Sequence, residues 1–374
     1  MPEAGRRETV GGSAVRSSGC RVMTDRAGPR FPRALVPSVV AAALLVQASL
    51  GCHRGGPVPP PPAEFDEARF ATKRLVAYEI PLETEGGVPR DMVIGRRQTY
   101  RIRNGDTLLD IARYYDLGYN EITEANPGID PWVPTPGVDI VLPTIWVVPC
   151  CTFEGIVLNI PEMRLYFYRP APEHPNTLLV VTHPVGLGRG DWRTPRGRFA
   201  VRGKTKNPTW VIPQSIRGER MRDRGDARRS IAGGDPENPL GAYRFELTVP
   251  RYAIHGTNKP WGIGRQVSHG CAQLYPEDIE RLFPLVEAGM PVEFTYQTIK
   301  VGQRHDAVYL EAHRDIYGYA PVTAAQARRV LVDRGLGADV DASTLEASLA
   351  GSRGVPVRVA SRAPEPDTER GARE

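Results

Sequence analysis

Short apolar runs separated by glycine and proline constrain the fold of this chain more than any other feature of its sequence. The 374 residues include 38 glycines and 36 prolines. Short runs bounded by such residues are typical of β-strands. We therefore predict a mainly β domain over residues 153–299, a β-sandwich or barrel-like fold. Its strands are expected at residues 155–159, 163–168, 178–182, 197–201, 243–247 and 291–296.

The same domain is expected to contain only one or two helices. Pro276 suits a first helical position, and Glu277 and Asp278 suit the positive end of a helix. Apolar residues then recur at helical spacing, at Ile279, Leu282, Phe283 and Val286. We predict a helix here whose apolar face packs on the strands.

A smaller module is expected over residues 98–143. Tyr100 and Ile102 alternate as in a strand, and Gly105 and Asp106 turn the chain. A helical stripe follows at Leu108, Ile111, Ala112 and Tyr115. A second short helix at 120–126 would stop before Pro127, and residues 138–142 suit a closing strand. The pattern predicts a small βααβ domain.

The N-terminus has the pattern of a secretory signal sequence, which we place at residues 1–52. Basic residues precede an apolar stretch at 34–50 that ends in Gly51 and Cys52. We expect Cys52 to be lipidated after cleavage, with simple cleavage or an uncleaved anchor as alternatives. Either way the chain would leave the cytoplasm for the cell envelope, on the periplasmic side of a membrane. Residues 53–97 begin with a proline-rich run and are predicted to form a linker and lead-in.

The segment from His255 to Cys271 carries the residue types of a cysteine acyl-transfer site. A cysteine near its free pKa is only a few per cent thiolate at neutral pH, so a histidine must take its proton or stabilise the anion. His255 and His269 are the two candidates. Gly270 permits a tight turn, after which the backbone N–H groups of residues 269–271 would converge on an oxyanion.

These motifs, HGT at 255–257 and SHGC at 268–271, resemble the signature of the L,D-transpeptidase catalytic domain, also called the YkuD domain. A glycine-rich loop separates them, as in that family. Three upstream segments resemble the same domain in the same order: PVGLGRGDWRTPRGRFAV (184–201), NPTW (207–210) and NPLGAYRF (238–245).

The resemblance implies a cysteine transpeptidase that acts on peptidoglycan. Cys271 would attack a tetrapeptide stem, release D-alanine and pass the acyl group to an amine. His255 would be the general base, oriented by the backbone carbonyl of Gly256. His269 and Gly270 would serve the oxyanion hole or contact the substrate.

One position departs from the family pattern. Many relatives follow SHGC with an apolar residue and then arginine or asparagine, whereas this chain has Ala272 and Gln273. Glutamine keeps an amide but lacks the charge that pairs with a substrate carboxylate. We therefore expect a different donor or acceptor preference. The other expected substrate contacts are Ser268, Thr257 and Trp210.

The segments GDTLLDIARYY (105–115) and EANPGID (124–130) resemble a LysM domain. Such domains bind the N-acetylglucosamine-containing glycan of cell walls. The resemblance implies glycan contacts at Gly105, Asp106, Thr107, Asn126 and Pro127. The alternative is a small structural domain that binds nothing.

Residues 300–374 are expected to form a C-terminal extension. A helix is predicted at 323–336, and the chain beyond Gly351 is polar and predicted to be disordered. Cys150 and Cys151 are adjacent, too close for an ordinary unstrained bridge and without zinc-ligand spacing, so packing or an adventitious disulfide is expected instead of a function. The remaining histidines form no spaced cluster, namely His174, His183, His305 and His313. We therefore predict no metal and no cofactor.

The net charge of +5 is spread along the chain and lacks the dense basic stripe of a nucleic-acid-binding protein. Peptidoglycan is the expected partner. The acceptor amine is open between a neighbouring stem peptide, giving a 3–3 crosslink, and a lysine of an envelope lipoprotein. Two other hypotheses are a hydrolase with the same nucleophile, such as an L,D-carboxypeptidase, and a non-catalytic wall-binding lipoprotein.

Overall fold

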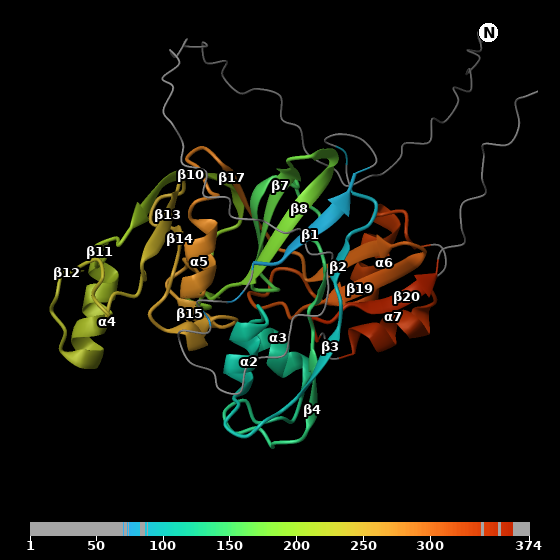
Figure 1. The fold of residues 1–374 in the computed structure, drawn as a ribbon, viewed down its shortest axis with the longest axis horizontal. Coiled ribbons are helices and arrows are strands. Elements are labelled where there is room, and N and C mark those ends of the chain that lie inside the picture. The colour runs from blue at the N-terminus through green and yellow to red at the C-terminus, as the bar shows by residue number, and fades with distance from the viewer. Residues whose placement is uncertain are drawn as a thin grey trace, which may run out of the picture.

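The computed structural model describes residues 70, 73, 75–82, 87, 89–337, 340–350 and 353–361. The predicted signal sequence, Cys52 and the proline-rich run lie outside the described residues. No helix within these ranges is long and apolar enough to cross a membrane. In Figure 1 a large central sheet carries the LysM-like helices below it, a C-terminal sheet on the right and an arm with helix α4 on the left.

The small βααβ module is present as predicted. Its elements are β3 (Gln98–Arg101), α2 (Leu108–Tyr114), α3 (Tyr119–Ala125) and β4 (Asp139–Leu142). β3 and β4 pair antiparallel. Thr107 is the N-cap of α2, because its hydroxyl accepts a hydrogen bond from the backbone N–H of Asp110 at 3.1 Å. The predicted apolar stripe of α2 is buried in the core.

The mainly β domain is built on a nine-stranded sheet with the order β1-β8-β7-β6-β17-β10-β13-β14-β16. The bounds are β1 (Ala77–Pro81), β6 (Gly155–Asn159), β7 (Arg164–Ala171), β8 (His174–Pro184), β10 (Gly197–Lys206), β13 (Tyr243–Leu247), β14 (Ala253–His255), β16 (Ala272–Gln273) and β17 (Pro291–Thr295). All six predicted strands are found. The pairs β17–β6 and β14–β16 are parallel, and the other pairs are antiparallel.

Two helices accompany this sheet, α4 (Gln214–Arg224) and α5 (Pro276–Leu282). α5 is the helix predicted after Cys271, and Ile279 and Leu282 pack in the core as expected. α4 belongs to an arm with the two-stranded sheet of β11 (Trp210–Val211) and β12 (Ser230–Ile231). The prediction of a mainly β fold with one or two helices is confirmed.

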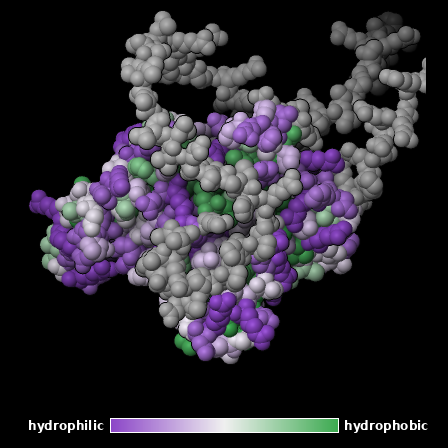
Figure 2. Space-filling view, in the orientation of Figure 1, coloured by the Kyte–Doolittle hydropathy of each residue, from purple (hydrophilic) through white to green (hydrophobic). Residues whose placement is uncertain are grey.

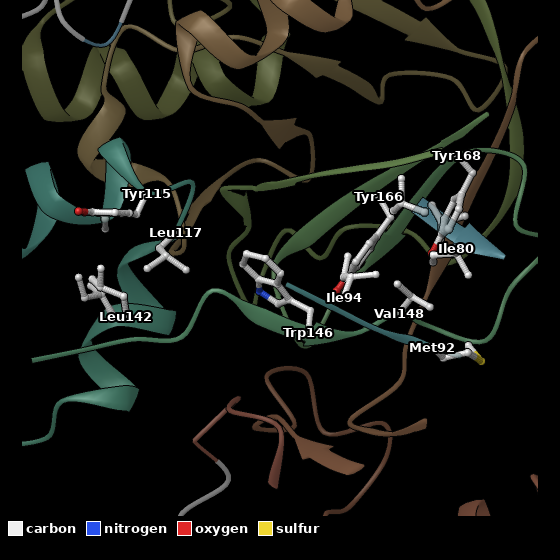
Figure 3. Packing of buried hydrophobic residues seen from close by; sticks show 14 of the residues in the cluster. Ile80, Met92, Ile94, Tyr115, Leu117, Leu142, Trp146, Val148, Tyr166 and Tyr168 are labelled. Atoms are coloured by element: carbon white, nitrogen blue, oxygen red, sulfur yellow. The ribbon is translucent and has the colours of Figure 1, made fainter. Parts of the chain in front are cut away.

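Both faces of the central sheet are buried, because neighbouring residues alternate between two hydrophobic clusters. On β6, Ile156 and Leu158 join the cluster that includes α5, whereas Val157 joins the cluster shared with the LysM-like module. In Figure 3, Trp146 lies between Leu117 of that module and Tyr166 of the sheet. The two modules therefore share one core and are not separate bodies on a linker.

Buried ion pairs reinforce this junction. Arg164 on β7 and Glu121 on α3 pair at 2.8 Å, with side chains 0% and 4% exposed. Arg164 also stacks on the Trp146 ring, 4.3 Å from its centroid. Because a lone buried charge is costly, this pair fixes the position of α3 against the sheet.

The structure corrects two predictions about the chain outside these modules. Residues 53–97 are not only a linker and lead-in: β1 is the edge strand beside β8, and β2 (Val93–Gly95) pairs with β5 (Ile145–Val147). The chain beyond Gly351 is not wholly disordered, because it forms β20 (Val357–Ser361). A β20 side chain, Val359, packs in the C-terminal core, so burial offsets the polar composition there.

The C-terminal extension has its own three-stranded sheet, in the order β18-β19-β20. Its other elements are β18 (Ile299–Arg304), β19 (Ala307–Ala312), α6 (Ala324–Asp333) and α7 (Ala342–Leu349). α6 confirms the predicted helix. Residues 362–374 lie outside the described residues.

Candidate active site

His255 and Cys271 come together because their strands are parallel neighbours. β14 ends at His255, and β16 begins directly after Cys271, with Ile254 opposite Ala272. Ile254 and Ala272 point into the hydrophobic core. Strand alternation therefore places His255 and Cys271 on the other face of the sheet, on adjoining backbones.

The hydrogen bond of His255 fixes its tautomer. Its Nδ1 lies 2.7 Å from the backbone oxygen of Gly256, which can only accept, so Nδ1 is the donor. Nε2 is then left without a proton. The pKa of His255 is lowered to about 4, mainly by burial and also by the charge of Arg244, against the opposing effect of the Gly256 carbonyl. The imidazole is neutral at pH 7, as a general base must be.

The Cys271 thiol is also neutral at pH 7. Burial raises its pKa, while a hydrogen bond from the Ala253 backbone and the charge of Arg244 act in the opposite direction. The sulfur lies 3.8 Å from the backbone oxygen of Arg251. Cys271 is thus a thiol that would need a base in order to act as a nucleophile, not a preformed thiolate.

The turn before Cys271 depends on Ser268 and Gly270. Gly270 has φ +105°, and a Cβ there would lie 2.5 Å from the Tyr252 ring, so only glycine fits. The buried Ser268 hydroxyl donates to the Cys271 carbonyl at 2.6 Å and accepts from the Gly270 N–H at 3.0 Å. The Gly270 N–H is therefore engaged inside the loop, and Ser268 shapes the turn.

His269 points toward the arm. Its Nε2 lies 2.7 Å from a Glu219 carboxylate oxygen on α4, and Arg189 pairs with the same carboxylate at 3.0 Å. These contacts lower the pKa of Glu219 to about 2. Trp192 packs edge-on against the His269 ring. His269 thus joins the arm to the loop between His255 and Cys271, called the nucleophile loop (residues 256–271). Figure 2 shows the arm, at the left, as mainly hydrophilic.

The other predicted substrate residues take different positions. The Thr257 hydroxyl is buried and accepts from the Lys259 N–H at 3.0 Å, so it shapes the loop. Trp210 packs in the small core of the arm. Gln273 is half-buried, and its side chain lies beside Gly186 and Gly262. Of these three residues, only Gln273 lies directly opposite His255 on a neighbouring strand.

In the LysM-like module, three of the predicted glycan contacts use their side chains internally. Asp106 accepts from the Tyr100 hydroxyl at 2.7 Å, and Thr107 caps α2. The Asn126 amide bonds the Ile122 and Val141 carbonyls at 2.8 Å each. Gly105 has φ +85° with open space around it, and Pro127 lines a cavity. Gly105 and Pro127 are the two predicted residues that remain open to a ligand.

That cavity, of about 630 Å³, lies where the LysM-like module, the nucleophile loop and the C-terminal extension meet. Its lining includes an aromatic residue, a carboxylate and three arginines, namely Tyr119, Glu124, Arg265, Arg314 and Arg353. The Arg265 guanidinium lies 3.5 Å from the Tyr119 ring centroid. Elements of the LysM-like module and of the candidate active site therefore adjoin.

Two buried clusters were missed by the sequence reasoning, because their members are far apart in the chain. Asp116, His183 and Asp278 form one, and Glu162, Glu311 and His313 form the other. His183 and His313 each lie beside two carboxylates, although their spacing in the sequence gave no sign of it. Lysine ammonium groups already lie between the carboxylates: Lys73 is 2.7 Å from Asp116, and Lys300 is 2.8 Å from Glu162.

Three residues close to the site were also missed, namely Arg244, Glu219 and Tyr252. Arg244 stands in the NPLGAYRF segment, which marked it as part of the domain but gave it no role. Glu219 lies in α4, a helix that was not predicted because no apolar stripe marks it in the sequence. Tyr252 is recognised only through its close approach to Gly270.

The comparisons with known proteins agree with this geometry. Residues 154–294 match the family model described as "L,D-transpeptidase catalytic domain", and residues 100–143 match the LysM domain. The chain is 33% identical over 303 residues to "Probable L,D-transpeptidase YbiS" of Escherichia coli, covering 77% of this chain and 94% of that protein. It is 32% identical over 305 residues to "Probable L,D-transpeptidase ErfK/SrfK" of the same organism, covering 78% and 94%.

A solved "L,D-transpeptidase from Mycobacterium smegmatis" matches 38% of this chain and 58% of that chain at 20% identity, with a TM-score of 0.28. The family model covers the strands and loops that hold both His255 and Cys271. The relatives match at more than 30% identity along nearly their whole length. The chain therefore belongs to the L,D-transpeptidase family of enzymes and carries a LysM domain.

Proposed function

We propose that this enzyme cleaves a peptidoglycan tetrapeptide stem and transfers its acyl group to an amine. One observation carries the proposal: His255 has its Nδ1 bound to the Gly256 carbonyl and its Nε2 free, on the same face of the sheet as Cys271. A neutral imidazole and a neutral thiol on adjoining strands form a general-base nucleophile pair.

The reaction balances in two steps. The Cys271 sulfur bonds the carbonyl carbon of the third stem residue while its proton passes to His255 Nε2. The C–N bond then breaks, and His255 returns the proton to the departing D-alanine amine, leaving a thioester. An acceptor amine attacks the thioester, gives its proton to His255, and the thiol is restored. We assign the backbone N–H groups of His269 and Cys271 to the oxyanion.

The test is incubation of the purified protein with disaccharide tetrapeptides, followed by mass spectrometry. Crosslinked dimers that disappear in Cys271→Ala support transpeptidation. Tripeptide without dimers favours the hydrolase, with water as acceptor. No product from the wild-type protein would overturn the enzymatic proposal and favour a wall-binding lipoprotein.

We propose an amine of a neighbouring stem or a lysine of an envelope lipoprotein as the acceptor. Adding a lysine-terminated peptide to the same reaction separates them: a peptide-linked product at the expense of stem dimers identifies the protein-type acceptor. Dimers that are insensitive to the peptide identify the stem.

We further propose that the chain is exported to the cell envelope, is lipidated at Cys52 and binds wall glycan through its LysM domain. The signal-like segment and the exposed Gly105 turn support this placement. Membrane fractionation of the wild-type protein and Cys52→Ala tests the anchor, since only the wild type should stay with membranes. Sedimentation of the soluble protein with purified sacculi tests wall binding.

A further inference from the structure

Three side chains form one row across the active site. Arg244 on β13 lies opposite His255 on β14, and His255 lies opposite Gln273 on β16. Residues directly opposite each other on paired strands project from the same face. The adjacent row, Phe245, Ile254 and Ala272, faces the hydrophobic core. Arg244, His255 and Gln273 therefore all project toward the site.

Arg244 is the cation of this row. Its side chain is 30% exposed, and its guanidinium lies 3.2 Å from a Glu246 oxygen. Glu246 also pairs with Arg202 at 2.8 Å. Two arginines thus share one carboxylate, which leaves a net positive charge at this edge of the site. The charge acts at the reacting groups, since it lowers the pKa of both His255 and Cys271.

The chemistry of the departing group places an anion beside this cation. His255 must protonate the nitrogen of the leaving D-alanine, and that nitrogen is bonded to the carbon that bears the carboxylate. A terminal carboxylate is therefore held within two bonds of an atom that His255 must reach. A guanidinium next to His255 is suited to bind it, since arginine pairs with carboxylates in a planar, bidentate manner.

We propose that Arg244 binds the terminal carboxylate of the donor stem and sets a preference for a donor that ends at the leaving residue. This inference rests on the proposed function. Gln273 lies on the other side of His255 and has an uncharged amide. Arg244 would therefore supply the positive charge that an arginine at position 273 would otherwise bring. In a longer stem the carboxylate would lie one residue beyond Arg244.

The experiment compares a tetrapeptide donor with the same peptide ending in a carboxamide. The wild-type protein is expected to prefer the carboxylate by about 10- to 100-fold in kcat/KM, the range for a hydrogen bond to a charged group. Arg244→Gln should reduce this ratio to about one, and Arg244→Lys should retain part of it. Arg329→Gln is the control: it removes an exposed cation of the C-terminal extension that pairs with Asp333, and should keep the preference.

A second measurement needs no peptide turnover. Cys271 is alkylated with iodoacetate and with iodoacetamide, which differ mainly in charge. The ratio of the iodoacetate rate to the iodoacetamide rate should fall in Arg244→Gln and stay unchanged in Arg329→Gln, with equal melting temperatures showing that both variants are folded.

The outcomes separate the two proposals. An Arg244→Gln variant that keeps the carboxylate preference, or loses activity equally on both donors, overturns the inference. An alkylation ratio that Arg244→Gln does not change does so as well. A wild-type protein that shows the alkylation preference but processes neither peptide overturns the proposed function and keeps Arg244 as an anion-binding residue.

Discussion

Gly118 of the LysM domain lies directly against Gly264 of the nucleophile loop. A Cβ on Gly118 would lie 2.9 Å from the Gly264 Cα, and a Cβ on Gly264 would collide with the backbone nitrogen of Tyr119. The Tyr119 N–H also donates to the Ile263 carbonyl at 3.0 Å. The LysM domain therefore supports the loop that joins His255 to Cys271.

Gly264→Ala should open this contact. Gly264 has φ +78°, so alanine adds backbone strain to the collision, and we expect a loss of about 1–3 kcal/mol in the free energy of unfolding with reduced kcat/KM. Urea unfolding and turnover measure both. Gly190→Ala is the control, because nothing lies within 4 Å of its added Cβ. Equal stability of the two variants would refute the role of the contact.

Arg164→Met should destabilise the junction of the two domains by about 3–5 kcal/mol, because it leaves the Glu121 carboxylate buried without its partner. The double variant Arg164→Met with Glu121→Gln should recover part of the loss. Arg329→Ala serves as the surface control: its ion pair with Asp333 is 76% and 67% exposed, and should change stability by about 0.5 kcal/mol or less. Thermal or urea unfolding is measured for the wild type and the three variants.

The rate of Cys271 alkylation, plotted against pH, should show no plateau near neutral pH. Since the pKa of His255 is lowered to about 4 and that of Cys271 is raised, the pair is neutral at pH 7. The iodoacetamide rate should rise with pH through and beyond the ordinary range of thiols, while kcat/KM falls only as the pH approaches 4. A neutral plateau that disappears in His255→Ala would instead reveal a thiolate–imidazolium pair.

Ser268→Ala should leave the Gly270 N–H buried without an acceptor. The expected loss is about 1–3 kcal/mol of unfolding free energy, together with a lower kcat as the turn before Cys271 relaxes. Ser268→Thr retains the hydroxyl and is the matched variant. Full activity of Ser268→Ala would show that the turn does not depend on this side chain.

Stability should fall in alkaline solution through His183. Although burial opposes it, Asp278 and Asp116 raise the pKa of His183 to about 9. Because this folded-state pKa lies above the unfolded value of about 6.5, the contribution is complete below pH 6.5 and is lost as the pH rises through 9. Urea midpoints between about pH 6 and 10 should decline less steeply in His183→Gln. Equal slopes in the two proteins would contradict this.

Local patterns in the sequence determined the elements and the chemistry. The runs at 155–159 and 243–247 became strands with those bounds, and the HGT and SHGC motifs identified His255 and Cys271. Such features depend on side-chain periodicity, turn residues and caps within a few positions. β2 was not predicted because such local features do not mark it: it is only three residues long, and its partner β5 lies some fifty residues further along the chain.

Only the tertiary structure decided which distant residues meet. Strand register placed Arg244 beside His255, the arm brought Glu219 to His269, and packing gathered Asp116, His183 and Asp278 around Lys73. No local pattern specifies such neighbours, because they are set by the pairing of strands and the burial of whole faces. The sequence thus predicted the proposed nucleophile and its base, and the fold decided the charges that surround them.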